Sequence, residues 1–197
     1  MILIHSLPRH IEENYEIYQW RHALAILACD FPSEWDDICS VLGEFRLCKS
    51  FIATPGGRKS PVSEWIDGSF YRLGWAEKNF STAFVVDGRS VDSPTHSIDC
   101  FKNEIGIEIE WNNKDPFFDR DLNNFRLLFD LRVISAGVII TRCDGLQRIF
   151  DGLNRGKSYG SSTTHMSKLR PKIDGGGGGG CPIIVFGIKE TLYDENC

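Results

Sequence analysis

Apolar residues recur at steps of three and four along several stretches of the chain, a spacing that is typical of amphipathic helices. The first stretch predicts one long helix over residues 10–31, in which Ile17, Trp20, Leu24 and Leu27 share a face and Pro32 ends the helix. Further helices are predicted over residues 33–45, from Ser60 and Pro61 to about Gly74, over residues 115–130 and, as a short helix, over residues 144–153.

Alternating and continuous apolar runs predict the strands. From Ile105 the order Ile, Gly, Ile, Glu, Ile, Glu, Trp predicts a strand that buries the Ile and Trp side chains and places Glu108 and Glu110 on its other face. A preceding antiparallel strand would carry Asp99, with a turn at residues 102–103. Residues 136–141 are apolar and β-branched, so we expect a strand covered on both faces that pairs in parallel with the Glu108 strand. Residues 81–86 and 182–188 predict two more strands.

The remaining segments lack this periodicity. Residues 54–59 carry turn residues and are predicted to form a loop. Residues 154–174 are polar and basic, and the six glycines at 175–180 predict a flexible loop or linker that is too featureless to bind phosphate in a defined way. A chain of 197 residues is most simply one domain.

Composition excludes several classes of protein. Hydrophobic residues make up 42% of the chain and charged residues 25%, and no apolar run approaches the ~20 residues that a membrane span needs, so we expect a soluble protein with no membrane partner. The first ten residues lack the apolar core and cleavage site of a signal peptide, which predicts a cytoplasmic location. The seven cysteines form no CxxC pair, so reduced thiols are expected rather than a disulfide framework or a zinc site.

The net charge of −5 argues against a nucleic-acid partner, since phosphate binding usually requires a basic surplus. The distribution of charge changes the picture. Residues 142–172 hold seven Lys or Arg against two Asp, a local +5, and the rest of the chain holds 15 basic against 25 acidic residues. A basic segment in an acidic chain fits a DNA-binding face, and a solvated charged loop is the alternative.

Three carboxylates come together if residues 97–113 form two adjoining strands. Asp99 lies nine residues before Glu108, and Glu110 follows two residues later. Carboxylate oxygens are the ligands that Mg²⁺ prefers, and such an ion polarises a phosphodiester and lowers the pKa of a water molecule. The spacing therefore indicates a metal-dependent nuclease site. The alternative is a half-exposed strand whose solvent face merely carries glutamates, because this spacing also arises by chance in acidic chains.

Four features in order resemble the type II restriction endonucleases of the BamHI, BglII and BstYI group. They are the helix-then-Trp pattern SPVSEWIDGSFYRLGWAEK, Asp99 followed by GIEIEW and two asparagines, the helix FFDRDLNNFRLLFDL running into SAGVIIT, and GKSYGSSTTHMSKLR leading to CPIIVFGI. No single motif is specific, and their order and spacing carry the resemblance. It covers about two-thirds of the chain, from Pro61 to the last strand.

The resemblance implies an α/β fold with a restriction-endonuclease-like core, a central mixed sheet flanked by helices. It also implies a homodimer that cleaves palindromic double-stranded DNA with Mg²⁺, for which Mn²⁺ can substitute. Asp99 and Glu108 match the metal ligands, and Glu110 matches the third catalytic position, where many nucleases of this fold have Lys. Glu77 matches a further acidic group on the preceding helix, in a register that could be shifted by one residue.

The single domain is then expected to comprise a helical scaffold (residues 1–60), a catalytic core (61–142), a DNA-contacting segment (143–174), the glycine loop (175–180), and a final strand and tail (181–197). Bases in the major groove are recognised by Arg, Lys, Asn and hydroxyl side chains. One candidate group is Asn112, Asn113, Arg120, Asn123 and Asn124. The favoured group lies in the basic segment: Arg155, Lys157, Ser158, Ser161, Ser162, Thr163, Thr164 and His165.

Two other functions stay open on this sequence. One is a repair or anti-phage nuclease of the same core without fixed sequence specificity. The other is a non-catalytic DNA-binding module whose carboxylates are only surface charge.

Overall fold

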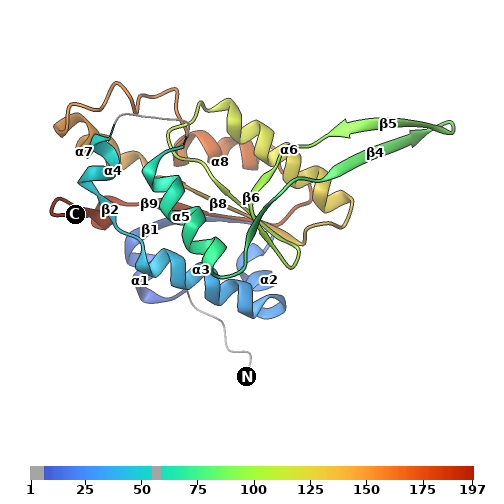
Figure 1. Ribbon diagram of the computed structural model, residues 1–197, viewed down its shortest axis with the longest axis horizontal. Coiled ribbons are helices and arrows are strands. Elements are labelled where there is room, and N and C mark those ends of the chain that lie inside the picture. Colours follow the sequence, from blue (N-terminus) through green and yellow to red (C-terminus); the bar gives the residue numbers. More distant parts are fainter. Residues whose placement is uncertain (1–6, 55–58) are drawn as a thin grey trace.

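A six-stranded mixed sheet with helices on both sides forms the centre of the molecule, in a computed structural model that describes residues 7–54 and 59–197 (Figure 1). The strand order is β1-β9-β8-β7-β6-β3. Helices α2, α3 and α5 lie on one side of the sheet, and α6 and α8 lie on the other. This arrangement confirms the predicted α/β fold with a central mixed sheet.

The elements follow one another along the chain with these bounds. The helices are α1 (Arg9–Asn14), α2 (Ala23–Asp30), α3 (Pro32–Glu44), α4 (Lys49–Ala53), α5 (Pro61–Arg72), α6 (Pro116–Asp130), α7 (Gln147–Gly152) and α8 (Met166–Asp174), with 3-10 turns η1 (Asp144–Leu146) and η2 (Glu190–Leu192). The strands are β1 (Tyr15–Trp20), β2 (Leu47–Cys48), β3 (Ala76–Lys78), β4 (Ser81–Val86), β5 (Arg89–Pro94), β6 (Ile98–Lys102), β7 (Ile105–Ile109), β8 (Ala136–Arg142), β9 (Ile183–Ile188) and β10 (Tyr193–Asp194). No helix within the described ranges is long and apolar enough to cross a membrane.

Three adjacent strands inside the sheet are largely apolar because both of their faces are covered. β7, β8 and β9 are buried along their whole lengths, and they pair in parallel, with Glu108 beside Ile139 and Ile139 beside Val185. This confirms the predicted parallel partner of the Glu108 strand. β6 and β7 form the predicted antiparallel pair, joined by a turn in which Asn103 and Glu104 adopt left-handed backbone angles.

The helices on either side of these strands begin as predicted. Ser60 caps α5 by accepting a hydrogen bond of 3.0 Å from the Ser63 amide, and Pro61 occupies the first turn. Helix α6 also begins with a proline, but the side chain of Asp115 makes no capping hydrogen bond. Instead the Asp115 amide donates to the Ser162 carbonyl at 3.0 Å, which ties the start of α6 to the basic segment.

The predicted helix over residues 10–31 is wrong, because its middle forms strand β1. The sequence YEIYQW is rich in aromatic and β-branched residues, and it pairs antiparallel with β9, Tyr15 opposite Ile188 and Trp20 opposite Ile183. Arg21 and His22 then adopt φ values of 53° and 59°, which separate the strand from α2. The apolar residues at helical spacing therefore belong to two elements.

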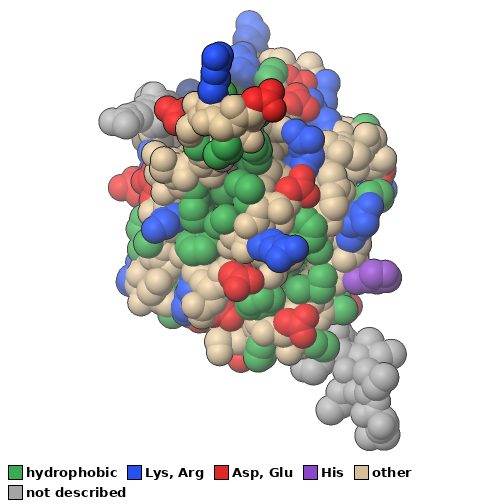
Figure 2. Space-filling model, turned by 90° about the vertical axis from the view of Figure 1, so that its right-hand side faces the viewer, with side chains coloured by type: hydrophobic (Ala, Val, Ile, Leu, Met, Phe, Trp, Pro, Cys, Tyr) green, Lys and Arg blue, Asp and Glu red, His purple; other side chains and the backbone are tan. Residues whose placement is uncertain are grey.

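Strands β4 and β5 form a hairpin that projects from the body of the molecule (Figure 1). The turn at Asp87 and Gly88 has positive φ at both residues, as the tight hairpin connection requires. Figure 2, which views the end from which the hairpin projects, shows hydrophobic side chains among charged ones. Phe84, Val85, Val86 and Val91 of the hairpin are exposed.

Residues 166–180 contain more order than the sequence predicts. Helix α8 occupies Met166–Asp174, and it buries Met166, Leu169 and Ile173 within the segment that was expected to be an irregular basic loop. The six glycines form a hydrogen-bonded turn rather than a flexible linker, with φ of 86° at Gly176 and 57° at Gly179. A Cβ at Gly178 would lie 2.4 Å from Ile183 Cδ1, so the turn packs closely against β9.

Cys48 and Cys197 form a disulfide with a Cα–Cα distance of 5.0 Å. The expectation that all thiols are reduced is therefore wrong for this pair, because β2 and β10 pair in parallel and bring residues 149 positions apart into contact. The predicted loop at residues 54–59 falls mostly on residues 55–58, and the expectation about a signal peptide falls mostly on residues 1–6. Both ranges lie outside the described residues.

Candidate active site

Asp99 and Glu108 lie side by side at one end of the antiparallel pair β6 and β7. Cys100 pairs with Ile107, which places Asp99 opposite Glu108 at the next position of the register. The Ile109 amide donates a hydrogen bond of 2.9 Å to Asp99 Oδ2 and so fixes this carboxylate. Burial raises the pKa of Asp99, and the Ile109 hydrogen bond acts against that shift. The predicted convergence of these two residues is present in the fold.

Glu108 and Glu110 are both buried, with relative exposures of 1% and 2%. Burial raises the pKa of Glu108 well above its ordinary value, and the nearby carboxylates of Asp121 and Asp99 raise it further. Burial, with Asp121 as the next contributor, raises the pKa of Glu110 to about 10. The alternative of a half-exposed strand with glutamates facing solvent is therefore excluded.

Glu110 follows the end of β7 and is held by two neighbours. Asn113 Nδ2 donates to Glu110 Oε2 at 2.8 Å, and Arg120 lies with its guanidinium 3.5 Å from Glu110 Oε1. Arg120 also contacts Asp121 Oδ1 at 2.9 Å and stacks over the Phe117 ring. The third carboxylate of the predicted site thus has a fixed orientation, set by residues from the loop after β7 and from the first turns of α6.

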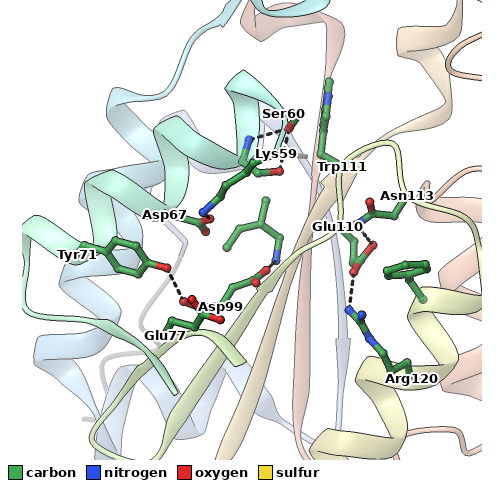
Figure 3. A pocket seen from close by; sticks show the side chains of 13 residues that line it. Lys59, Ser60, Asp67, Tyr71, Glu77, Asp99, Glu110, Trp111, Asn113 and Arg120 are labelled. Atoms are coloured by element: carbon green, nitrogen blue, oxygen red, sulfur yellow. Dashed lines mark hydrogen bonds and ion pairs between the residues drawn. The ribbon is translucent and has the colours of Figure 1, made fainter. Parts of the chain in front are cut away.

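A pocket of about 510 Å³ opens beside these carboxylates (Figure 3). Residues from α5, β3, β6, the loop after β7 and α6 line it, and its walls carry Asp67, Glu77, Asp99 and Glu110 together with the cations Lys59 and Arg120. Trp111, Phe117 and Ile109 supply apolar surface. The pocket is therefore a polar cleft with a surplus of acidic groups at one end of the sheet.

Helix α5 contributes groups to the pocket that the sequence did not indicate as site residues. Asp67 forms an ion pair with Lys59, and burial raises the pKa of its carboxyl group to about 6. Tyr71 donates from its hydroxyl to the Asp99 carbonyl at 3.1 Å. Asp67 directly follows Ile66 on the buried side of α5, and a carboxylate on the apolar side of a helix is the signal that would have identified it.

Glu77 lines the same pocket but lies on strand β3 and is exposed. The expectation that it belongs to the preceding helix is therefore wrong, because α5 ends at Arg72 and Gly74 has a φ of 85°. The acidic group that α5 presents to the pocket is Asp67.

A histidine and two carboxylates gather on the α6 side of β7. His96 Nε2 lies 3.3 Å from Glu108 Oε1 and 3.1 Å from Asp121 Oδ1, and Asp121 is fully buried. The three side chains can hold a metal ion, since one ligand atom from each lies within 4.8 Å of the others. Neither His96 nor Asp121 was predicted to be a site residue. Asp121 follows Phe118 by three positions on the buried stripe of α6, which is again the available signal.

In the first candidate DNA-contacting group, some side chains are exposed and others make hydrogen bonds or ion pairs within the protein. Asn123 is exposed and accepts from Arg126 at 2.8 Å, whereas Asn124 is buried and donates to the His96 carbonyl at 3.2 Å. Asn113 and Arg120 hold Glu110, as described above. Asn112 adopts a φ of 59°, and its side-chain oxygen is buried.

The second group also divides. Lys157, Ser158, Ser161 and Ser162 are exposed, and Arg155 lies 3.4 Å from the Thr54 carbonyl. The other three members, Thr163, Thr164 and His165, are buried. Their side chains bond inside the protein, to the Gly160 carbonyl, the Glu110 carbonyl and Asp144 respectively. The buried members attach this segment to the loop that carries Glu110.

The chain is similar to a known protein family over most of its length. The family model of the restriction endonuclease BglII/BglIII matches residues 15–188, which is most of the chain and includes every element of the candidate site. A search of curated proteins finds no match. A restriction endonuclease hydrolyses DNA at specific sites, and such enzymes are typically metal-dependent. The chain belongs to the restriction endonuclease BglII/BglIII family.

Proposed function

We propose that this enzyme cleaves both strands of a palindromic DNA sequence with Mg²⁺ held by Asp99 and Glu108, and with Glu110 as the third active-site group. The observation that carries the proposal is the placement of these carboxylates. They come from one antiparallel strand pair and the loop that follows it, and Asp99 and Glu110 face a cleft of about 510 Å³.

The residues present fit a hard divalent cation. The donors are carboxylate oxygens, which Mg²⁺ and Mn²⁺ prefer. Asp99 and Glu108 are close enough for their charges to interact, and the Asp99 carboxylate therefore raises the pKa of Glu108. Two buried negative charges without a cation are costly, and a divalent ion offsets that cost. When bound, the cation supplies Lewis-acid polarisation of the scissile phosphate.

The chain's own residues set the geometry around the phosphate. The Ile109 amide orients Asp99, and Asn113 and Arg120 orient Glu110. Lys59 and Arg120 place positive charge in the walls of the cleft, where a phosphodiester would lie. Glu77 is exposed at the same cleft, whereas Asp67 and Glu110 are buried and Asp99 is partly buried. These contacts hold the reacting groups before DNA arrives.

The bases are recognised mainly by residues 155–162, namely by the partly buried Arg155 and by the exposed Lys157, Ser158, Ser161 and Ser162. Two observations support this choice. The segment lies within the basic part of the chain, and its buried neighbour Thr164 bonds to the Glu110 and Asn113 backbone. A base contact made here is therefore mechanically linked to the catalytic loop. Asn112 and Asn123 offer further contacts.

The enzyme acts as a homodimer, since a palindromic duplex presents two-fold related phosphates and a two-fold symmetric protein matches them. Each protomer then cuts one strand.

The test is cleavage of a plasmid of mixed sequence by the wild-type chain, with Mg²⁺, with Mn²⁺ and with excess chelator. Discrete fragments that vanish with chelator are expected. A smear would instead indicate a nuclease without fixed specificity, and DNA binding with no cleavage would indicate a binding module.

Variants assign the reaction to the site. Asp99→Asn and Glu108→Gln should abolish cleavage, whereas Glu12→Gln, which alters an exposed carboxylate on α1, should leave it intact. Full cleavage by Asp99→Asn would refute the proposed site.

A further inference from the structure

The cluster of His96, Glu108 and Asp121 differs from the cleft in position and in chemistry. None of these three is among the described residues that line the 510 Å³ cleft. His96 instead lines a second pocket of about 210 Å³, together with Thr95, Arg120, Asn123, Asn124 and Leu127. The cluster thus lies between β7 and α6, and it opens to solvent by a separate route.

The polar atoms of this cluster are buried and unsatisfied. Among the described residues, Asp121 Oδ2 has no hydrogen-bond partner, and His96 Nε2 lies 3.3 Å from Glu108 Oε1 and 3.1 Å from Asp121 Oδ1 without a well-aligned hydrogen bond to either, although Glu108 and Asp121 are almost completely buried. A buried carboxylate oxygen that accepts no hydrogen bond costs about 1–3 kcal/mol or more. A neutral imidazole has one N–H, so Nε2 can donate to only one of the two carboxylates at a time.

The local charge also calls for a cation. Glu108, Glu110 and Asp121 lie close together, and Arg120 is the permanently charged partner that contacts them, at Asp121 and Glu110. Glu108 has His96 as its close basic neighbour. With Asp99 there are four carboxylates, and the basic groups beside them are one guanidinium and one imidazole.

The spacing of the ligand atoms suits a single small ion. Around an ion with bonds of about 2.1 Å, neighbouring ligand atoms are about 3.0 to 3.4 Å apart. The distances of 3.3 Å and 3.1 Å from His96 Nε2 to the two carboxylates fall in this range. One imidazole nitrogen with two carboxylate oxygens favours first-row transition ions over Mg²⁺, whose ligands are nearly all oxygens.

We propose that His96, Glu108 and Asp121 form a second metal site, which binds a divalent transition ion such as Mn²⁺ and discriminates against Mg²⁺. The 210 Å³ pocket provides the entry path to His96, whose side chain is 22% exposed. Glu108 belongs to both sites, because it also neighbours Asp99. An ion bound here would fix the Glu108 carboxylate from the α6 side.

Pulsed electron paramagnetic resonance of Mn²⁺ bound to the full-length chain without DNA tests this site directly. Mn²⁺ is the suitable probe because it binds free thiols weakly, and this chain has several. The expected spectrum contains modulation from a directly bound ¹⁴N nucleus. Growth of the wild-type chain with ¹⁵N-labelled histidine should replace that pattern by the one of ¹⁵N, which identifies the donor as histidine without any substitution.

Substitutions then identify which histidine binds. His96→Gln should abolish the nitrogen modulation and weaken this Mn²⁺ binding at least about 10-fold, the lower end of the loss seen for outer partners of metal ligands. The matched control is His22→Asn, which removes an exposed histidine and suits the left-handed backbone there. Asp99→Asn should keep the nitrogen modulation.

Absence of nitrogen modulation at saturating Mn²⁺, or its persistence in folded His96→Gln, would overturn the second site. Its complete loss on addition of equimolar Mg²⁺ would also overturn the stated selectivity. These measurements need no DNA cleavage, so they can fail while the endonuclease proposal holds, and they can succeed while it fails.

Discussion

The close contact of helix α6 with the sheet depends on Gly137, and Gly137→Ala is expected to destabilise the protein. Gly137 lies on β8 directly beneath the Phe125 ring of α6. A Cβ added there would be 2.5 Å, 2.6 Å and 3.0 Å from three ring atoms. Ordinary contacts of a Cβ begin near 3.4 Å. The ring would therefore have to move by roughly 0.9 Å, the difference between 3.4 Å and 2.5 Å.

Overpacking of this size in a close-packed core costs about 1–3 kcal/mol. For a chain of this length each kcal/mol lowers the midpoint of thermal unfolding by about 2–4 °C, so a decrease of about 2–12 °C is expected. Helix α6 also carries Arg120 and Asp121. A shift of the helix would move both away from Glu110 and His96, and cleavage should fall together with stability.

Urea denaturation of the purified variant gives the change in unfolding free energy, provided that the slope with denaturant is unchanged. The matched control is Gly152→Ala on α7, where an added Cβ meets nothing within 4 Å. That change should be neutral or stabilise the protein by up to about 1 kcal/mol. Addition of Phe125→Leu to Gly137→Ala should restore part of the loss, because the smaller side chain frees the space.

A Gly137→Ala variant as stable as the wild type would contradict the reasoning. It would mean that α6 can move away from the sheet with little loss of unfolding free energy. A double variant that is no better than the sum of its single changes would show that the contact with Phe125 is not the cause of the loss.

Further expectations concern the site. Without metal, Asp99→Asn should bind DNA more tightly than the wild type in fluorescence anisotropy, because it removes a negative charge that faces a phosphate. Arg155, Lys157 and Ser158 are replaced singly by Ala, and cleavage of the cognate site is compared with cleavage of its single-base variants. Loss of a base contact should cost about 1–3 kcal/mol of recognition at one base pair, whereas loss of a phosphate contact should reduce cleavage of all sequences alike. If none alters cleavage or discrimination, the exposed loop does not recognise DNA. Sedimentation should show a dimer on a palindromic duplex, and a monomer both free and bound would contradict it. Burial raises the pKa of Asp67 to about 6, so the stability that this group contributes is fully present below about pH 4 and is lost as the pH rises through 6. The midpoint of urea unfolding should therefore change less between pH 4.5 and pH 7 in Asp67→Asn than in the wild type.

The elements that the sequence predicts correctly are those whose pattern is set by local burial. Helix α5 and helix α6 each carry a regular apolar stripe behind an N-terminal proline, and β8 is apolar throughout. Strand β1 was missed because Ile17 and Trp20 fit helical spacing as well as an alternating pattern. What decides between them is pairing with β9, which lies about 170 residues further along the chain.

The candidate site shows the same division. Asp99 and Glu108 could be placed together because two short strands joined by a tight turn fix their register within ten residues. Asp67, His96 and Asp121 could not be placed with them. The elements that carry these residues, which are α5, the segment before β6, and α6, reach the site only through tertiary packing. Each of the two aspartates nevertheless lies on a largely apolar helix face, so the pattern indicated a buried carboxylate even though it did not indicate the partner of that carboxylate.

The acidic composition, which argued against DNA, is explained by where the carboxylates lie. The formal charge of −5 treats every Asp and Glu as ionised. Burial raises the pKa of Glu110 to about 10 and shifts the pKa of Glu108 in the same direction, so these two side chains ionise less readily than exposed carboxylates. The formal count therefore overstates the negative charge that faces a DNA backbone. A divalent cation in the cleft would reduce it further, while the positive charge of Lys157 remains exposed. Net charge is thus a poor guide to DNA binding in an enzyme that buries several of its carboxylates.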